Sequence, residues 1–171
     1  MRMSRLTSLL LCFAAAGVPA AVVWAWLAEP SLWVVSDGKL FLTEANAGGQ
    51  FEVVVAFAAI GVVLSFVFGI ITERLARPNQ WQTVLALALV ALAAAFICWQ
   101  LGILLGPPAP SEVPGLESGD KVPAQLKVDA VAPFLAWPLG AVLGYTLSFY
   151  LGSDGLASDD QEPISADEIS A

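Results

Sequence analysis

Histidine is absent from the sequence, and charged residues make up only 13% of its 171 positions. Without histidine the chain lacks the most common general base of enzymes, and the usual zinc, haem and copper ligand sets cannot be assembled from it alone. The two cysteines, Cys12 and Cys98, lie in separate apolar runs, so neither a disulfide nor a Cys-x-x-C metal site is expected. We therefore predict no catalytic residues, no metal site and no cofactor.

Positively charged residues are also few. The chain has seven Lys and Arg residues against fifteen Asp and Glu residues. Six of the acids lie in residues 154–171, so the body of the chain is nearly neutral and offers no basic surface for nucleic acid. The tail, residues 153–171, contains no basic or aromatic residue and has too little apolar surface to offset the entropy of ordering. We predict a disordered acidic tail in the cytoplasm, which either only solvates the chain end or binds a basic partner.

Apolar residues are abundant, at 58% of the chain, which is far above the fraction found in soluble globular proteins. A helix needs about 20 mainly apolar residues to cross the bilayer core. Four stretches meet this requirement: residues 6–28, 51–72, 83–106 and 131–151. We predict that residues 1–152 form an all-α transmembrane four-helix bundle in contact with membrane lipids.

The first stretch is interpreted as a span rather than as a cleaved signal peptide. Its apolar run is too long for a typical signal sequence, and it ends at Trp24 and Trp26. Tryptophan is enriched at membrane interfaces, so we expect both residues to anchor the end of this span.

The positive charges near the span ends predict the orientation in the membrane. Arg2 and Arg5 precede the first span, and Arg74 and Arg77 lie in the short connection between the second and third spans. The longer connections contain three lysines among several acids: Lys39, Lys121 and Lys127. We therefore predict a multi-pass protein of the bacterial plasma membrane, with both termini cytoplasmic and the two longer loops outside.

The two outer loops, residues 29–50 and 107–130, carry strand signals. In the first loop, the Asp37-Gly38 pair separates two runs of strand-forming residues, which is a strong signal for a two-residue β-hairpin. In the second loop, apolar and polar residues alternate over residues 125–129, which predicts a third strand that pairs with the hairpin. Because an isolated hairpin is marginal in water, a small extracytoplasmic sheet is favoured over the alternative of two disordered connections.

Small residues recur at four-residue intervals in the second and fourth spans, a pattern that permits close helix packing in lipid. They are Gly61, Ser65 and Gly69 in the second span and Gly140, Gly144 and Ser148 in the fourth. These two spans run in the same direction in the predicted topology, so the two stripes can meet within one chain or between two. We predict a helix-packing or partner interface, with tight internal packing favoured over a docking face for another membrane protein or a second copy.

Few polar residues in or next to the predicted spans could take part in binding or catalysis. Gln100 is the only large polar side chain well inside a span, and a hydrogen bond to another helix is a sufficient explanation for it. Glu52 and Asp129 lie at the outer starts of two spans, where the helix dipole favours a carboxylate, so helix capping is the favoured interpretation. The alternative is an outer polar site, formed by Glu52, Asp129 and Gln100, that binds a cation or a lysine of a partner.

Through four motifs, the chain resembles a family of uncharacterised actinobacterial four-span membrane proteins, and the similarity extends from Ala20 to Gly152. The motifs are W-V-V-S-D-G from Trp33, W-Q-L-G-I-L-L-G-P from Trp99, L-K-V-D-A from Leu126 and L-A-W-P from Leu135. The resemblance implies the four-span topology and a plasma-membrane location, and it supplies no activity. The acidic tail lies outside it.

The expected function is that of a non-enzymatic accessory subunit or assembly factor of a larger membrane complex, in the respiratory chain or the cell envelope. The alternative is a small oligomeric transporter or channel, in which Gln100, Ser65 and Thr146 would line a shared path. A membrane enzyme acting on lipid is less favoured, because only Glu52, Asp129 and Glu73 lie near a predicted membrane surface.

Overall fold

A computed structural model describes residues 2–36, 39–42, 48–75 and 81–157. Four long helices account for most of this part of the chain: α1 (Arg2–Leu27), α2 (Gly48–Leu75), α3 (Trp81–Leu105) and α4 (Ala132–Ala157). Each contains a stretch long and apolar enough to cross a membrane, which confirms the four long apolar helices predicted from the sequence. The predicted tail, residues 153–171, lies largely outside the described residues.

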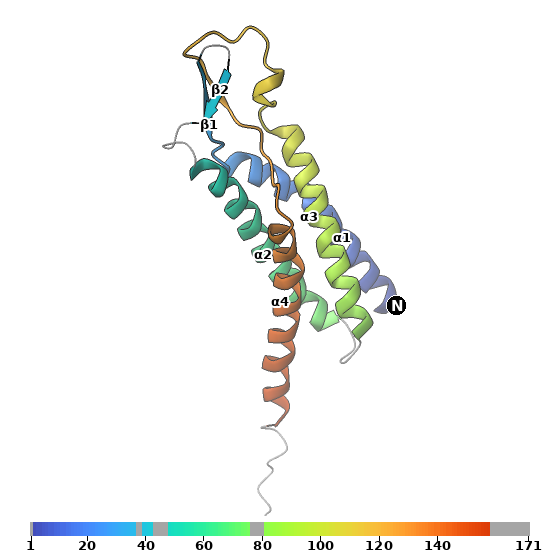
Figure 1. Ribbon diagram of the computed structural model, residues 1–171. Helices are drawn as coiled ribbons and strands as arrows, with labels where there is room; N and C mark the ends of the chain where they lie inside the picture. The colour runs from blue at the N-terminus through green and yellow to red at the C-terminus, as the bar shows by residue number, and fades with distance from the viewer. Residues whose placement is uncertain (1, 37–38, 43–47, 76–80, 158–171) are drawn as a thin grey trace, which may run out of the picture.

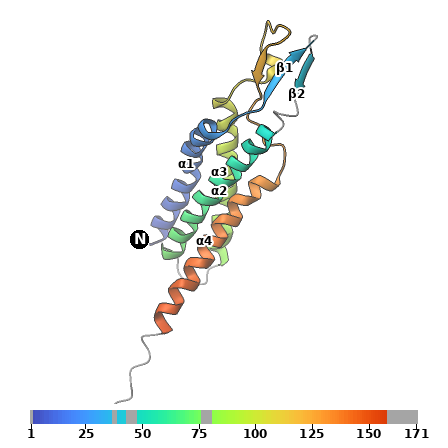
Figure 2. The same cartoon turned by 90° about the vertical axis from the view of Figure 1, so that its left-hand side faces the viewer.

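The helices form two closely packed pairs, because α2 packs along α4 and α1 packs along α3. The pairs meet where α3 contacts α4 and α1 contacts α2, whereas α2 and α3 hardly touch. Helices α2 and α4 run in the same direction, away from the end of the bundle that carries the strands, and α1 and α3 run towards it (Figures 1 and 2). We call this end the sheet end and the other the opposite end.

The described strands form one antiparallel sheet at the sheet end. Strand β1 (Leu32–Ser36) lies between β2 (Lys39–Leu42) and β3 (Lys121–Pro123). The last pair of the β1–β2 ladder joins Ser36 to Lys39, so two residues connect the strands. This confirms the predicted hairpin, although Asp37 and Gly38 themselves lie outside the described residues.

The third strand lies earlier in the chain than residues 125–129, where the sequence predicted it. Its ladder is extended by hydrogen bonds from the Val35 amide to the Asp120 carbonyl, at 3.0 Å, and from the Ala124 amide to the Ser31 carbonyl, at 2.7 Å. After Ala124 the chain leaves the sheet and runs along the helices, with Leu126 and Val128 buried in the core. The alternation therefore did reflect an extended chain with one buried face, but that face packs on helices rather than in a sheet.

Aromatic side chains fill the centre of the bundle. Phe57 on α2 lies 5.1 Å from Trp24 of α1, 5.1 Å from Phe134 and 5.6 Å from Trp137 of α4, measured between ring centroids. Trp99 of α3 meets Phe134 edge to face, so all four helices contribute rings to one cluster. Such pairs stabilise the packing beyond the apolar area that they bury.

The expectation that Trp24 and Trp26 anchor the same helix end is wrong for Trp24. The Trp24 side chain is fully buried, and its indole Nε1–H donates a hydrogen bond to the Val53 carbonyl oxygen at 2.9 Å. Trp26 is 84% exposed. Two residues are separated by about 200° around an α-helix, so the two indoles point to nearly opposite faces.

Candidate functional site

The predicted small-residue stripes lie against each other along the α2–α4 contact. The Cα atoms of Gly140 and Gly144 approach the backbone of Val62 and Phe66, because a Cβ built at either glycine would lie 3.0 Å from the facing Cα atom. A Cβ at Gly69 would overlap the Ala141 carbonyl oxygen in the same way. The two helices therefore fit backbone against backbone, in the manner that small residues permit.

The other members of the stripes have different environments. A Cβ at Gly61 would overlap the Trp137 indole ring, so this glycine provides space for a side chain rather than for a backbone. Ser65 is fully buried, and its hydroxyl has no hydrogen-bond partner among the described residues. The Trp137 indole nitrogen is likewise buried without a described partner. This part of the contact is held by packing rather than by polar bonds.

Ser148 has a polar role that its place in the stripe did not reveal. Its hydroxyl donates a hydrogen bond of 2.8 Å to the Glu73 carboxylate, which links α4 to α2 at the opposite end. For Glu73, the sequence indicates only a position near a predicted membrane surface. The pairing depends on the register of α2 against α4, and no pattern within either segment specifies that register.

The opposite end also contains a cavity of about 270 Å³ between α2 and α4. Glu73, Arg74 and Ser148 form its polar lining, and Ile70, Leu147 and Leu151 form its apolar lining. Three residues with polar side chains thus line one cavity, and the other residues of its lining are apolar side chains and Gly152.

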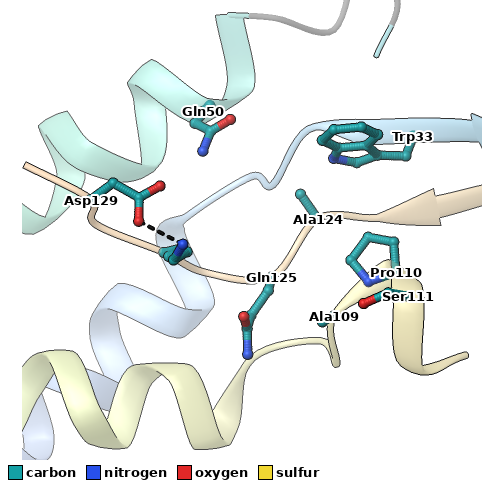
Figure 3. A pocket seen from close by; sticks show the side chains of 9 residues that line it. Trp33, Gln50, Ala109, Pro110, Ser111, Ala124, Gln125 and Asp129 are labelled. Atoms are coloured by element: carbon teal, nitrogen blue, oxygen red, sulfur yellow. Dashed lines mark ion pairs between the residues drawn. The ribbon is translucent and has the colours of Figure 1, made fainter. Parts of the chain in front are cut away.

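A second cavity, of about 300 Å³, lies at the sheet end (Figure 3). Gln50 of α2 and Asp129 lie on one side of it, and Trp33 of β1 and Pro110 lie on the other. Lys127 and Asp129 form an ion pair of 2.8 Å at its edge, with both side chains more than half exposed. Asp129 is therefore paired with a residue of its own segment, and an exposed pair of this kind contributes little stability.

The predicted outer polar site of Glu52, Asp129 and Gln100 is not assembled around one cavity. Only Asp129 lines the sheet-end cavity, Glu52 is exposed on the first turns of α2, and Gln100 is exposed on α3. Within the described residues, no group of three or more His, Cys, Asp or Glu side chains is placed to hold a metal ion.

Gln100 lies on the face of α3 that points away from the other three helices. Its neighbours one helical turn away on either side are Phe96 and Leu104, which are 52% and 78% exposed. The expected hydrogen bond to another helix of the same chain is not found among the described residues.

Comparison with models of protein families, with curated proteins and with solved structures finds no match to this chain. The functional argument therefore depends on the arrangement of the residues described above.

Proposed function

We propose that this chain is a multi-pass protein of the bacterial plasma membrane, with both termini in the cytoplasm and the sheet outside. Exposed Trp and Tyr residues lie at both ends of the bundle, with Trp26 at the sheet end and Trp81 and Tyr150 at the opposite end. Tryptophan and tyrosine gather at the two surfaces of a bilayer in this way. On α2, the distance from Glu52 to Glu73 corresponds to about 32 Å of helix, which matches the bilayer core.

Its proposed role is that of a non-enzymatic accessory subunit or assembly factor of a larger membrane complex. The observation that carries this proposal is the closed interior of the bundle. The aromatic cluster and the glycine contacts fill it, and the buried polar side chains of the described part are only Ser31, Ser65, Thr72 and Thr83. Ionisable side chains inside the spans mark the ion and proton paths of many membrane proteins, and no Asp, Glu, Lys or Arg is buried in the described part.

The transporter alternative gains no support from the geometry. Its polar path would use Gln100, Ser65 and Thr146, which do not face a common space. Ser65 is buried between α2 and α4, Gln100 is exposed on α3, and Thr146 is exposed on α4 with its hydroxyl bonded to the Val142 carbonyl at 2.7 Å. A path shared between chains would need these groups on one outward face, whereas Ser65 is fully buried inside the chain.

The proposed partner contact is the outward face of α3 that carries Gln100. An amide that faces lipid has no hydrogen-bond partner there, and polar side chains of this kind stabilise contacts between helices in membranes. The stripes on α2 and α4 contact each other within the chain, so they are not offered as the partner surface.

Purification of the tagged native protein in a mild detergent, with identification of the proteins that accompany it, tests this proposal. We expect recovery with a larger complex at fixed stoichiometry, and weaker recovery of that complex with the Gln100→Leu variant. Leu143→Ala, which trims an outward-facing side chain of α4, is the matched control and should retain the complex. Recovery of the chain alone, or only as a homo-oligomer, would contradict the accessory-subunit proposal.

A further inference from the structure

The cavity at the opposite end is lined by both charged and hydrocarbon side chains. Its volume is about 270 Å³, and it lies between the last turns of α2 and the matching part of α4. Ile70, Leu147 and Leu151 supply the apolar wall, and Glu73 and Arg74 supply charges of opposite sign. An amphipathic ligand with both a hydrocarbon chain and charged groups is complementary to such a lining.

The two charged residues of the lining do not form an ion pair with each other. The only ion pair in the described part of the chain joins Lys127 to Asp129, so Glu73 and Arg74 line the same cavity without pairing with each other. Consecutive residues of a helix point about 100° apart, which keeps the two head groups from meeting. A ligand that places a cation at Glu73 and an anion at Arg74 therefore satisfies both.

The Glu73 carboxylate is held in place for such a ligand. Ser148 donates to one of its oxygens, Oε2, at 2.8 Å, and a carboxylate can accept several hydrogen bonds in all. A group with N–H donors can thus bind the same carboxylate without displacing Ser148. Charge-assisted hydrogen bonds of this type are stronger than neutral ones.

We propose that this cavity binds a zwitterionic phospholipid with a primary ammonium head group, such as a phosphatidylethanolamine. The ammonium binds Glu73, the phosphate binds Arg74, and one acyl chain lies along Ile70, Leu147 and Leu151. This proposal rests on the membrane placement proposed above, which puts Glu73 at the level of the lipid head groups. An anionic head group without an amine leaves Glu73 unpaired, and a trimethylammonium group has no N–H to donate.

The test is native mass spectrometry of the full-length protein, purified in mild detergent and supplied with equal amounts of dioleoyl phosphatidylethanolamine, phosphatidylcholine and phosphatidylglycerol. We expect the ethanolamine lipid to be retained about tenfold more than the choline lipid, or better, as expected for one hydrogen bond to a charged group. Equal retention of the three lipids by the unsubstituted protein would by itself overturn the proposal.

Two substitutions separate the contributions of the charges. Glu73→Gln keeps an acceptor for Ser148 but removes the negative charge, and we expect it to bring the ethanolamine-to-choline ratio close to one. Arg74→Gln should weaken retention of both lipids alike and leave their ratio unchanged, because both carry the phosphate. Glu52→Gln at the sheet end is the matched control and should leave all values unchanged. A preference that persists in Glu73→Gln would exclude the proposed contact.

A further measurement identifies the source of the head group. Free phosphoethanolamine, added at the same concentration as the lipid, should fail to displace the lipid, because phosphoethanolamine has no hydrocarbon chain to contact the apolar side chains of the cavity. Efficient displacement would overturn the lipid assignment.

Extraction of cell membranes with alkaline carbonate separates this proposal from the membrane placement. A chain released by carbonate contradicts the placement itself, whereas a chain that stays in the membrane but shows no lipid preference contradicts only the head-group site.

Discussion

The α2–α4 pair and the α1–α3 pair are packed by different means. Between α2 and α4, Gly69, Gly140 and Gly144 each face the backbone of the other helix. Between α1 and α3, only Gly17 faces backbone, and Gly102 instead faces the Trp24 ring. Both of these helices also carry buried alanines: Ala20 and Ala21 on α1, and Ala91, Ala94 and Ala95 on α3.

This difference predicts different tolerance to added volume. A backbone cannot move aside without shifting a whole helix, whereas side chains can change rotamer or shift slightly. The α2–α4 contact, with three glycines against backbone rather than one, should therefore be the less tolerant of the two. Gly144 and Gly17 both face backbone, so substitutions at these two positions compare how closely the two pairs fit.

The largest effect is expected for Gly144→Ala. The added methyl group would overlap the Phe66 carbonyl oxygen, with the Phe66 carbonyl carbon at 2.9 Å and its Cα atom at 3.0 Å. We expect a loss of about 3 kcal/mol or more in the free energy of unfolding, because three backbone atoms must move together. Titration with a denaturing detergent, followed by circular dichroism, measures the change.

Gly152→Ala is the matched control for this substitution. Gly152 lies on the same helix, and a Cβ at this position has no atom within 4 Å. The substitution should be neutral or should stabilise the helix by up to about 1 kcal/mol. Equal losses at Gly144 and Gly152 would show that the cost comes from the helix itself and not from the contact with α2.

Gly17→Ala is expected to have a smaller effect on the α1–α3 pair. Its Cβ would lie 2.5 Å from the Ala94 carbonyl oxygen, but the next atoms are at 3.1 Å and 3.2 Å, so one close contact dominates. We expect a loss of about 1–2 kcal/mol in the same titration. A loss as large as that of Gly144→Ala would show that the two pairs are equally rigid.

The sequence predicted those features that depend on a local pattern. The length of the apolar runs indicated the four helices, and Asp37-Gly38 between two strand-forming runs indicated the hairpin that joins β1 to β2. The four-residue spacing of Gly140 and Gly144 indicated a close contact. These signals each lie within a single segment, so no knowledge of the partner segment was needed.

Features that depend on the register between segments were not predicted. The alternation over residues 125–129 indicated an extended chain, but the partner surface, sheet or helix, lies far away in the sequence. Ser148 has the size of a packing residue, and only the alignment of α4 with α2 brings its hydroxyl to Glu73. Trp24 and Trp26 look alike in sequence, and their different burial follows from which face of α1 meets the other helices.

Trp24→Phe tests a contact that joins the two pairs. The substitution removes the 2.9 Å hydrogen bond to the Val53 carbonyl of α2 and leaves a small space beside Phe57. We expect a loss of about 1–2 kcal/mol in the free energy of unfolding. Trp26→Phe, at an exposed position of the same helix, is the control and should change it by less than about 0.5 kcal/mol. A larger loss at Trp26 than at Trp24 would contradict the burial described for this helix end.

Asp129→Asn should have the smallest effect, because its partner Lys127 belongs to the same extended segment and both side chains are more than half exposed. An exposed ion pair contributes at most about 1 kcal/mol, and screening by salt at about 1 M should remove that contribution. The unfolding titration, repeated at low and high salt, compares Asp129→Asn with the unsubstituted chain. The free energies of unfolding of the two chains should converge at high salt, since the lost interaction is purely a surface one.

A loss of stability in Asp129→Asn that exceeded the Gly17→Ala value and persisted in high salt would instead indicate that Asp129 supports the packing of the segment between β3 and α4. The sheet end would then be more constrained than the α1–α3 contact, and the contrast between the helix pairs would no longer describe the whole molecule.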